Sequence, residues 1–401
     1  MNKEYIRVPY GMTVHGEEEI KAVEKVLRSS TQMGENTKKF EGIIANEYGH
    51  THGVAVNSGS SALYVAMEVL NLPKGSEVIT PALTFATTVG CIVKNNLIPC
   101  FIDVEDNNSL IINVDRIERN INENTSALCI PNLMGNLPDW EKIKTLADKY
   151  NLKVLEDSAD IIGQRYKGNK TAEFADITIT SFYGMHIINC AGNGGMICTS
   201  NKSYAEKARL LRSWGRSSSL FVDSEDAESR FSVKVDDIDY DAKFIFEEIG
   251  YNFEPSELGS AFGLVQYDRL QDNLSKRNDS YKKLANYFLK FNKWIDLPYR
   301  SRDVETVWFA FPFFIKETAP FKRKDLMQFF ESRNIQTRVI FTGNITRQPA
   351  FRNISKTVDK DGLNVSDHIM RYGMLIACHH GLTNEMIEHI FSTFNDFAAK
   401  F

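Results

Sequence analysis

Short apolar runs alternate with helical patterns between residue 54 and about residue 200. Val54-Ala-Val56 is the first run and Lys153-Val-Leu-Glu156 the last, and the runs between them cover residues 77–80, 99–103 and 126–130. In βαβ units, parallel strands share one sheet and helices cover both of its faces. The alternation therefore predicts an α/β fold with a mostly parallel sheet.

The patterns at the two ends of the chain predict the domain organisation. Apolar residues at helical spacing predict an amphipathic helix over residues 16–30. Residues 217–241, rich in serine and acidic residues, are expected to form a loop or insertion. After about residue 265, a long polar helix precedes short strands and terminal helices. We therefore expect a large domain over residues 1–264 and a smaller α+β C-terminal domain over residues 265–401.

Composition and charge narrow the class of protein. The chain has 401 residues, 43% of them hydrophobic and 25% charged, which is typical of soluble globular proteins. Its formal net charge of −5 argues against nucleic acid as a partner. The N-terminus has no apolar signal segment, and no run reaches the ~18 apolar residues of a membrane span. We expect a cytoplasmic protein with neither a nucleic-acid nor a membrane partner.

Metal binding is not expected from the cysteines or histidines. The six cysteines are scattered, and none forms a Cys-x-x-Cys pair. This spacing favours buried, reduced thiols over a disulfide framework or a zinc site. His379-His380 is a second candidate, but no third ligand stands at a suitable spacing. The sequence therefore predicts no metal site.

Several candidate site residues follow predicted strands. Gly59 and Ser60 lie between a strand and a helix, where backbone N–H groups and the helix dipole favour an anion. Asp157 ends a strand, where a carboxylate can pair with a pyridinium nitrogen. Phe85 can stack on an aromatic cofactor, and His186 can transfer protons. Taken singly, Gly59 and Ser60 suit a simple turn equally well. A helix cap, a core aromatic and a packed histidine are the more common roles for Asp157, Phe85 and His186. Their order along one βαβ series favours a single cofactor site.

The segment around His186 carries the most specific signal. Ser181-Phe-Tyr-Gly-Met-His186, followed by the glycine-rich turn 192–195, resembles the Ser-Phe-x-x-x-Lys stretch of sugar-nucleotide aminotransferases that use pyridoxal phosphate (PLP). In those enzymes the lysine holds the cofactor as an imine. Imidazole forms no lasting imine, but its ordinary pKa of about 6.5 lets it move protons near neutral pH. The resemblance implies PLP or pyridoxamine phosphate (PMP) held non-covalently, with elimination in place of amino transfer.

The chain resembles the DegT/DnrJ family of PLP-dependent sugar-nucleotide enzymes over nearly its whole length. The segments that carry the resemblance are residues 57–63, 84–88, 134–136, 156–160, 181–195 and 250–257. This resemblance implies PLP fold type I, the aspartate-aminotransferase-like fold, with active sites at a homodimer interface. It also implies a cofactor site made of Gly59, Ser60, Phe85, Asp157, Asp160, Ser181 and Asn252. Of these, Gly59, Ser60 and Ser181 would hold the phosphate, and Asn252 would reach the phosphate of the neighbouring subunit.

Within the family, three features resemble the 3-dehydratase branch. His186 stands in the lysine position, and Asp160 stands where aminotransferases usually carry Gln. Gly343-Asn-Ile-Thr-Arg-Gln-Pro349 resembles a C-terminal motif of the branch. The resemblance implies C3 deoxygenation of a nucleotide-linked 4-keto-6-deoxy sugar, with His186 as the base and Asp157 supporting it. An amino-acid donor such as glutamate would regenerate PMP.

The iron–sulfur members of this branch carry a cysteine cluster just after a Trp-Gly-Arg segment. Here Trp214-Gly-Arg216 is followed by Ser217-Ser-Ser219, and no cysteine lies between residues 198 and 378. A [2Fe–2S] cluster needs four protein ligands, so we expect no iron–sulfur cluster.

Two departures from the family pattern leave the substrate open. Asn193 replaces a usual Glu, and Glu254 replaces a commonly basic residue. The nucleotide, the sugar and the need for a separate reductase are not determined by the sequence. A sugar-nucleotide aminotransferase and a non-catalytic sugar-nucleotide binder remain alternatives.

Overall fold

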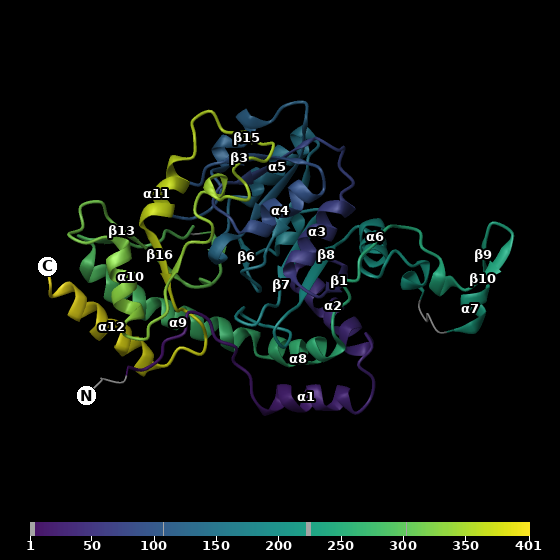
Figure 1. Cartoon of the computed structure of the whole chain (residues 1–401), viewed down its shortest axis with the longest axis horizontal. Helices are drawn as coiled ribbons and strands as arrows, with labels where there is room; N and C mark the ends of the chain where they lie inside the picture. The colour runs from purple at the N-terminus through teal and green to yellow at the C-terminus, as the bar shows by residue number, and fades with distance from the viewer. Residues whose placement is uncertain (1–4, 107, 222–225, 302) are drawn as a thin grey trace.

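The large sheet confirms the α/β prediction (Figure 1). The computed structural model describes residues 5–106, 108–221, 226–301 and 303–401, and within them eight strands form this sheet. In spatial order, they are β1 (His52–Val56), β8 (Gly195–Thr199), β7 (Ile177–Ser181), β5 (Lys153–Asp157), β4 (Thr125–Pro131), β2 (Glu77–Pro81), β3 (Ile98–Ile102) and β15 (Thr357–Val358). β8 runs antiparallel to both of its neighbours, and the other pairings are parallel.

Helices cover both faces of this sheet because its strands are apolar on both faces. Alternate residues such as Val54 and Val56 pack against one face, with α3 (Gly59–Val69), α4 (Ala86–Lys94) and α6 (Lys202–Arg212). Ala55 points the other way, toward α2 (Glu35–Tyr48), and α5 (Trp140–Tyr150) covers the same face farther along. The two-residue period of a strand explains this division.

A second, antiparallel sheet lies in the C-terminal half. Among the described residues it has four strands, in the order β11 (Ile295–Asp296), β13 (Phe311–Ile315), β16 (Gly373–Ile376) and β14 (Arg338–Val339). Its aromatic core packs against α9 (Leu270–Phe288), α10 (Arg323–Glu331) and α12 (Asn384–Ala398). The remaining longer helices are α1 (Glu17–Leu27), α8 (Glu257–Asp268) and α11 (Asn364–Tyr372). The short strands β12 (Val304–Glu305) and β6 (Arg165–Tyr166) pair separately.

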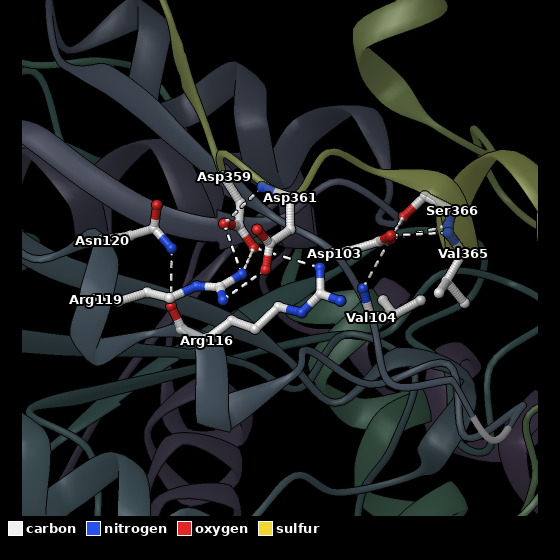
Figure 2. A network of polar contacts seen from close by, with 9 residues as sticks. All are labelled: Asp103, Val104, Arg116, Arg119, Asn120, Asp359, Asp361, Val365 and Ser366. Atoms are coloured by element: carbon white, nitrogen blue, oxygen red, sulfur yellow. Dashed lines mark hydrogen bonds and ion pairs between the residues drawn. The ribbon is translucent and has the colours of Figure 1, made fainter.

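Part of the C-terminal half is built into the large sheet. β15 pairs with β3, and Figure 2 shows the polar network that holds this segment. Arg119 Nη2 donates to both carboxylate oxygens of Asp359, at 2.8 and 2.7 Å, and the pKa of Asp359 is lowered by these bonds despite its burial. Asp103 accepts the hydroxyl of Ser366 at 2.6 Å. These contacts join residues on the two sides of the domain boundary predicted after residue 264. The boundary itself stays a prediction.

Residues 217–241 were expected to form a loop or insertion, and the loop alternative is wrong for most of the segment. Residues 222–225 lie outside the described residues. The rest forms a 3-10 turn (Ser217–Leu220), α7 (Ala227–Phe231) and an antiparallel hairpin of β9 (Val233–Val235) and β10 (Ile238–Tyr240). The hairpin was hidden because each strand offers only three alternating residues. Figure 1 shows α7 and the hairpin projecting away from the large sheet.

All six cysteines are buried free thiols. Among the described residues, no helix combines the length and apolar character that a membrane crossing requires.

Candidate functional site

The candidate residues gather at one edge of the large sheet. β5 ends at Asp157 and β7 ends at Ser181, while α3 and α4 begin just after β1 and β2. Since β2, β4, β5 and β7 are parallel, their carboxyl ends share this edge. Open α/β sheets bind ligands at such an edge.

The start of α3 lies against the end of β7. A Cβ atom added to Gly59 would lie 2.5 Å from Cβ of Ser181, so only glycine allows this approach. Ser58 caps the helix by accepting the N–H of Ser61 at 3.1 Å. Ser60 lies in the first turn and is partly exposed. This arrangement brings Gly59, Ser60 and Ser181 together at a helix N-terminus, which favours an anion such as a phosphate.

Asp157 is a buried carboxylate, 5% exposed. It accepts hydrogen bonds from Thr88 Oγ1 at 2.7 Å and from the N–H of Ala159 at 3.1 Å. Burial raises its pKa, and these two hydrogen bonds oppose the rise. No ion pair to Asp157 forms within the described part of the chain. Turns, not a helix, follow it, so the helix-cap alternative is wrong. The site is suited to a cationic partner.

Phe85 lies at the N-terminus of α4 with 53% of its surface exposed. Its ring meets the edge of Phe341, with centroids 6.2 Å apart and planes at 75°. The alternative that Phe85 is a core residue is therefore wrong. An exposed aromatic ring, three residues before the Thr88 that bonds Asp157, can stack on a flat heteroaromatic ring.

His186 is held in one orientation. Its Nδ1 lies 3.0 Å from the carbonyl oxygen of Ser181, and its ring meets Tyr183 and Phe309 edge-on. A carbonyl only accepts, so Nδ1 carries the proton and Nε2 keeps a free lone pair. Burial lowers the pKa of His186 to about 4, the Ser181 carbonyl raises it, and Arg277 lowers it further. The expectation of an ordinary pKa near 6.5 is corrected, and the ring is a neutral proton acceptor at pH 7.

Asp160 lies three residues beyond Asp157 and is partly buried. Its Oδ2 accepts the backbone N–H of Met134 at 2.9 Å, and Met134 has a left-handed φ of 59°. Burial raises the pKa of Asp160 to about 7, the Met134 N–H opposes the rise, and the charge of Asp157 adds to it. The site therefore holds two carboxyl groups whose charges depend on one another.

Comparison with known proteins identifies the family. The profile of the DegT/DnrJ/EryC1/StrS aminotransferase family matches residues 13–395. The chain belongs to this family.

Two relatives of this chain are 3-dehydratases. It is 33% identical to a dTDP-4-dehydro-2,6-dideoxy-D-glucose 3-dehydratase of Saccharopolyspora spinosa, over 98% of this chain and 86% of the relative. It is 30% identical to a GDP-4-keto-6-deoxy-D-mannose 3-dehydratase of Escherichia coli O55:H7, over 90% of this chain and 96% of the relative. These matches confirm the resemblance inferred from the sequence.

A solved structure confirms the predicted aminotransferase-like fold. The E. coli GDP-4-keto-6-deoxy-D-mannose-3-dehydratase with bound hydrated PLP superposes with a TM-score of 0.84 at 26% identity. The match covers 98% of this chain and 99% of that structure. PLP is thus the cofactor held by a close structural neighbour in the family.

Asn252 lies on a segment that passes the loop before α3. It is exposed, and its backbone pairs with that of Ser213. The next residue, Phe253, accepts the N–H of Asn57 at 2.9 Å, so this segment passes the loop before α3. A contact from Asn252 to a neighbouring subunit stays a prediction.

Two residues of this family member's site were not assigned from the sequence. Thr88 holds Asp157, and its position inside the segment 84–88 was the available signal. Arg277, 1% exposed, donates to the carbonyl oxygen of Phe309 at 2.8 Å beside the His186 ring, and burial lowers its pKa to about 10. The polar sequence of α9 does not indicate that the Arg277 side chain points into the protein. Tertiary packing alone placed Arg277.

His379 and His380 are buried. His379 Nε2 lies 3.0 Å from the carbonyl oxygen of Pro9. Among the described residues, no group of three or more potential ligands is placed to hold a metal ion.

Proposed function

We propose that the protein is a PLP/PMP-dependent 3-dehydratase that removes the C3 oxygen of a nucleotide-linked 4-keto-6-deoxy sugar. The observation that carries this proposal is His186, a neutral imidazole with a free Nε2 in the place of the family's lysine. The 3-dehydratase relatives support it, as does the PLP held by the E. coli enzyme.

The residues present fit the cofactor. Gly59, Ser60 and Ser181 would hold its phosphate, and the missing Cβ of Gly59 allows the start of α3 to lie against Ser181. The exposed face of Phe85 would stack on its ring, and the buried Asp157 would pair with the ring nitrogen. With no amine at position 186, the cofactor would be held non-covalently. When bound, it supplies an electron sink for cleavage of bonds next to the sugar carbonyl carbon.

The chain's own residues would then control the protons. The Ser181 carbonyl fixes the His186 tautomer, so Nε2 accepts a proton near the cofactor and returns it to the departing C3 oxygen. Asp157, held by Thr88 and Ala159, would pair with the ring nitrogen and favour its protonated form. Asp160, with a pKa of about 7, lies where aminotransferases usually carry Gln. Since imidazole cannot displace the sugar amine as lysine does, elimination is favoured over amino transfer.

Glutamate is the proposed amino donor, because its oxidation to 2-oxoglutarate supplies the two electrons that deoxygenation needs. The donor set around Ser217-Ser-Ser219 offers no thiolates, which supports a site without an iron–sulfur cluster. The protein is proposed to act in the cytoplasm.

A homodimer is proposed because large apolar side chains are exposed beyond α6. They lie on the projecting segment and on the chain that returns from it, and Ile249 is 95% exposed. They are Phe231, Val235, Ile238, Tyr240, Phe244, Phe246 and Ile249. Apolar surface of this kind marks an interface, and sedimentation would show whether a second copy covers it.

The test is a reaction of the purified protein with PLP, glutamate and 4-keto-6-deoxy sugars linked to CDP, dTDP or GDP. We expect a product that is lighter than the substrate by one oxygen atom, with one 2-oxoglutarate and one ammonia formed per product. The His186→Asn variant should bind cofactor without forming this product. An amino sugar would indicate an aminotransferase, and an unchanged sugar would indicate a binding protein; either result would overturn the proposal.

A further inference from the structure

The motif loop, defined as residues 341–349, packs against the segment that leads into α4. The N–H of Ile345 donates to the carbonyl oxygen of Ala82 at 3.0 Å. Thr342 Oγ1 donates to the carbonyl oxygen of Thr84 at 2.7 Å. A loop from the C-terminal half therefore contacts the residue directly before Phe85.

Three residues of the motif shape this loop. Gly343 has a φ of 61°, and a Cβ there would collide with Met370. Gln348 Nε2 donates to the carbonyl oxygen of Thr342 at 2.8 Å and closes the loop. Ile345 is fully buried in the cluster that also contains Ala82. The conformation that presents the Thr342 hydroxyl is thus built by the motif.

The contacted segment carries two of the groups proposed to hold the cofactor. Thr84 is fully buried, and Phe85 follows it as the N-cap residue of α4. In the first turn of α4, Thr88 donates its hydroxyl to Asp157. Phe341, at the start of the motif loop, meets the Phe85 ring edge-on. A shift at Thr84 would therefore move the stacking ring first and the Thr88–Asp157 bond second.

We infer that Thr342 is a positioning residue that sets the orientation of Phe85 for cofactor binding. The inference rests on the proposed function, because it assumes that Phe85 stacks on the cofactor ring. Removing the Thr342 hydroxyl leaves the buried Thr84 carbonyl without its donor. One neutral hydrogen bond of this kind corresponds to about a fivefold change in an equilibrium constant.

The test compares Thr342→Val with Thr342→Ser in the full-length protein, using PMP as the probe. Valine should raise the Kd for PMP about fivefold, and serine, which keeps the hydroxyl, should restore most of the affinity. In a Phe85→Ala background, the valine substitution should have almost no further effect, because the residue through which Thr342 acts is gone.

A matched control is Thr199→Val. Thr199 Oγ1 donates to the carbonyl oxygen of Asp176 at 2.8 Å and accepts the N–H of Asn201 at 3.2 Å, near the opposite edge of the large sheet. The valine variant therefore loses at least as much hydrogen bonding without touching Phe85. It should lower stability and leave the Kd for PMP unchanged. Without cofactor, hydrogen exchange over residues 82–88 should be faster in Thr342→Val than in Thr342→Ser or Thr199→Val.

Two results would overturn the inference. One is equal PMP affinity in Thr342→Val and the wild type; the other is an undiminished valine effect in the Phe85→Ala background. If the wild type binds neither PLP nor PMP, the proposed function fails. The exchange measurement still reports whether the motif loop holds residues 82–88, so the two failures are distinguishable.

Discussion

Replacing His186 with Asn should remove the proton acceptor and leave the surrounding structure in place. The asparagine amide can still donate toward the Ser181 carbonyl, which lies 3.0 Å from the present Nδ1, but it offers no basic nitrogen. A positioned general base contributes about 10²–10⁴-fold to a rate. We expect kcat to fall by about this factor, while the Kd for PMP changes little.

The pH dependence of the wild type gives a sharper test of the same residue. Burial lowers the pKa of His186 to about 4, so the neutral, active ring is lost only as the pH falls through that value. At about pH 5.5, roughly 97% of rings with a pKa of about 4 are neutral, against roughly 10% of rings with the ordinary pKa of about 6.5. The His186 contribution to kcat/KM should therefore stay nearly constant from pH 7 to pH 5.5.

The ionisation of Asp160 must be distinguished from that of His186, because the Asp160 pKa of about 7 lies inside the measured pH range. In the Asp160→Asn variant, we expect no change of activity near pH 7. The only remaining fall in activity should be the one caused by protonation of His186 at low pH. The assay follows 2-oxoglutarate and deoxy-sugar formation between pH 4 and pH 8 at constant ionic strength. A half-maximal kcat/KM near pH 6.5 in Asp160→Asn would refute the argument that burial keeps the ring neutral.

Two further predictions follow from the site and from the C-terminal network. Borohydride reduction of the PLP-loaded protein should leave the chain unmodified by mass spectrometry, and His186→Lys should gain a pyridoxyl adduct; an adduct on the wild type would contradict non-covalent binding. Asp359→Asn should lower the free energy of unfolding by about 1–3 kcal/mol in urea titrations, because Asp359 is 2% exposed and its ion pairs with Arg119 and Arg116 are lost. The matched Asp361→Asn change removes an exposed bridge to the same arginine and should cost under about 1 kcal/mol; equal losses would argue against a role for burial.

The main architecture, and the grouping of several candidate residues at one edge of the sheet, could be predicted from the sequence. The strand and helix periods are local, so the βαβ series up to β8 was readable from apolar spacing alone. Residues directly after strands must meet at one edge of a parallel sheet, which is why Asp157, Ser181 and Gly59 could be grouped. The replacement of lysine by His186 is a change of chemistry at one position, and it needs no structure to be noticed.

Other features depend on contacts between residues far apart in the chain. β15 joins β3 across more than half of the sequence, and two arginines hold it there. The Gly343–Pro349 motif was recognisable in the sequence. The packing of the motif loop, residues 341–349, against Ala82 and Thr84 was not.

The sequence by itself determined the alternation of strands and helices up to β8 and the kind of functional groups at the candidate site. Only the tertiary structure decided how those groups ionise and which way they face. Desolvation lowers the pKa of His186 to about 4, and one carbonyl selects its tautomer. The physical reason is that burial and long-range hydrogen bonding depend on what the folded chain brings together, whereas residue type and spacing are properties of the chain before it folds.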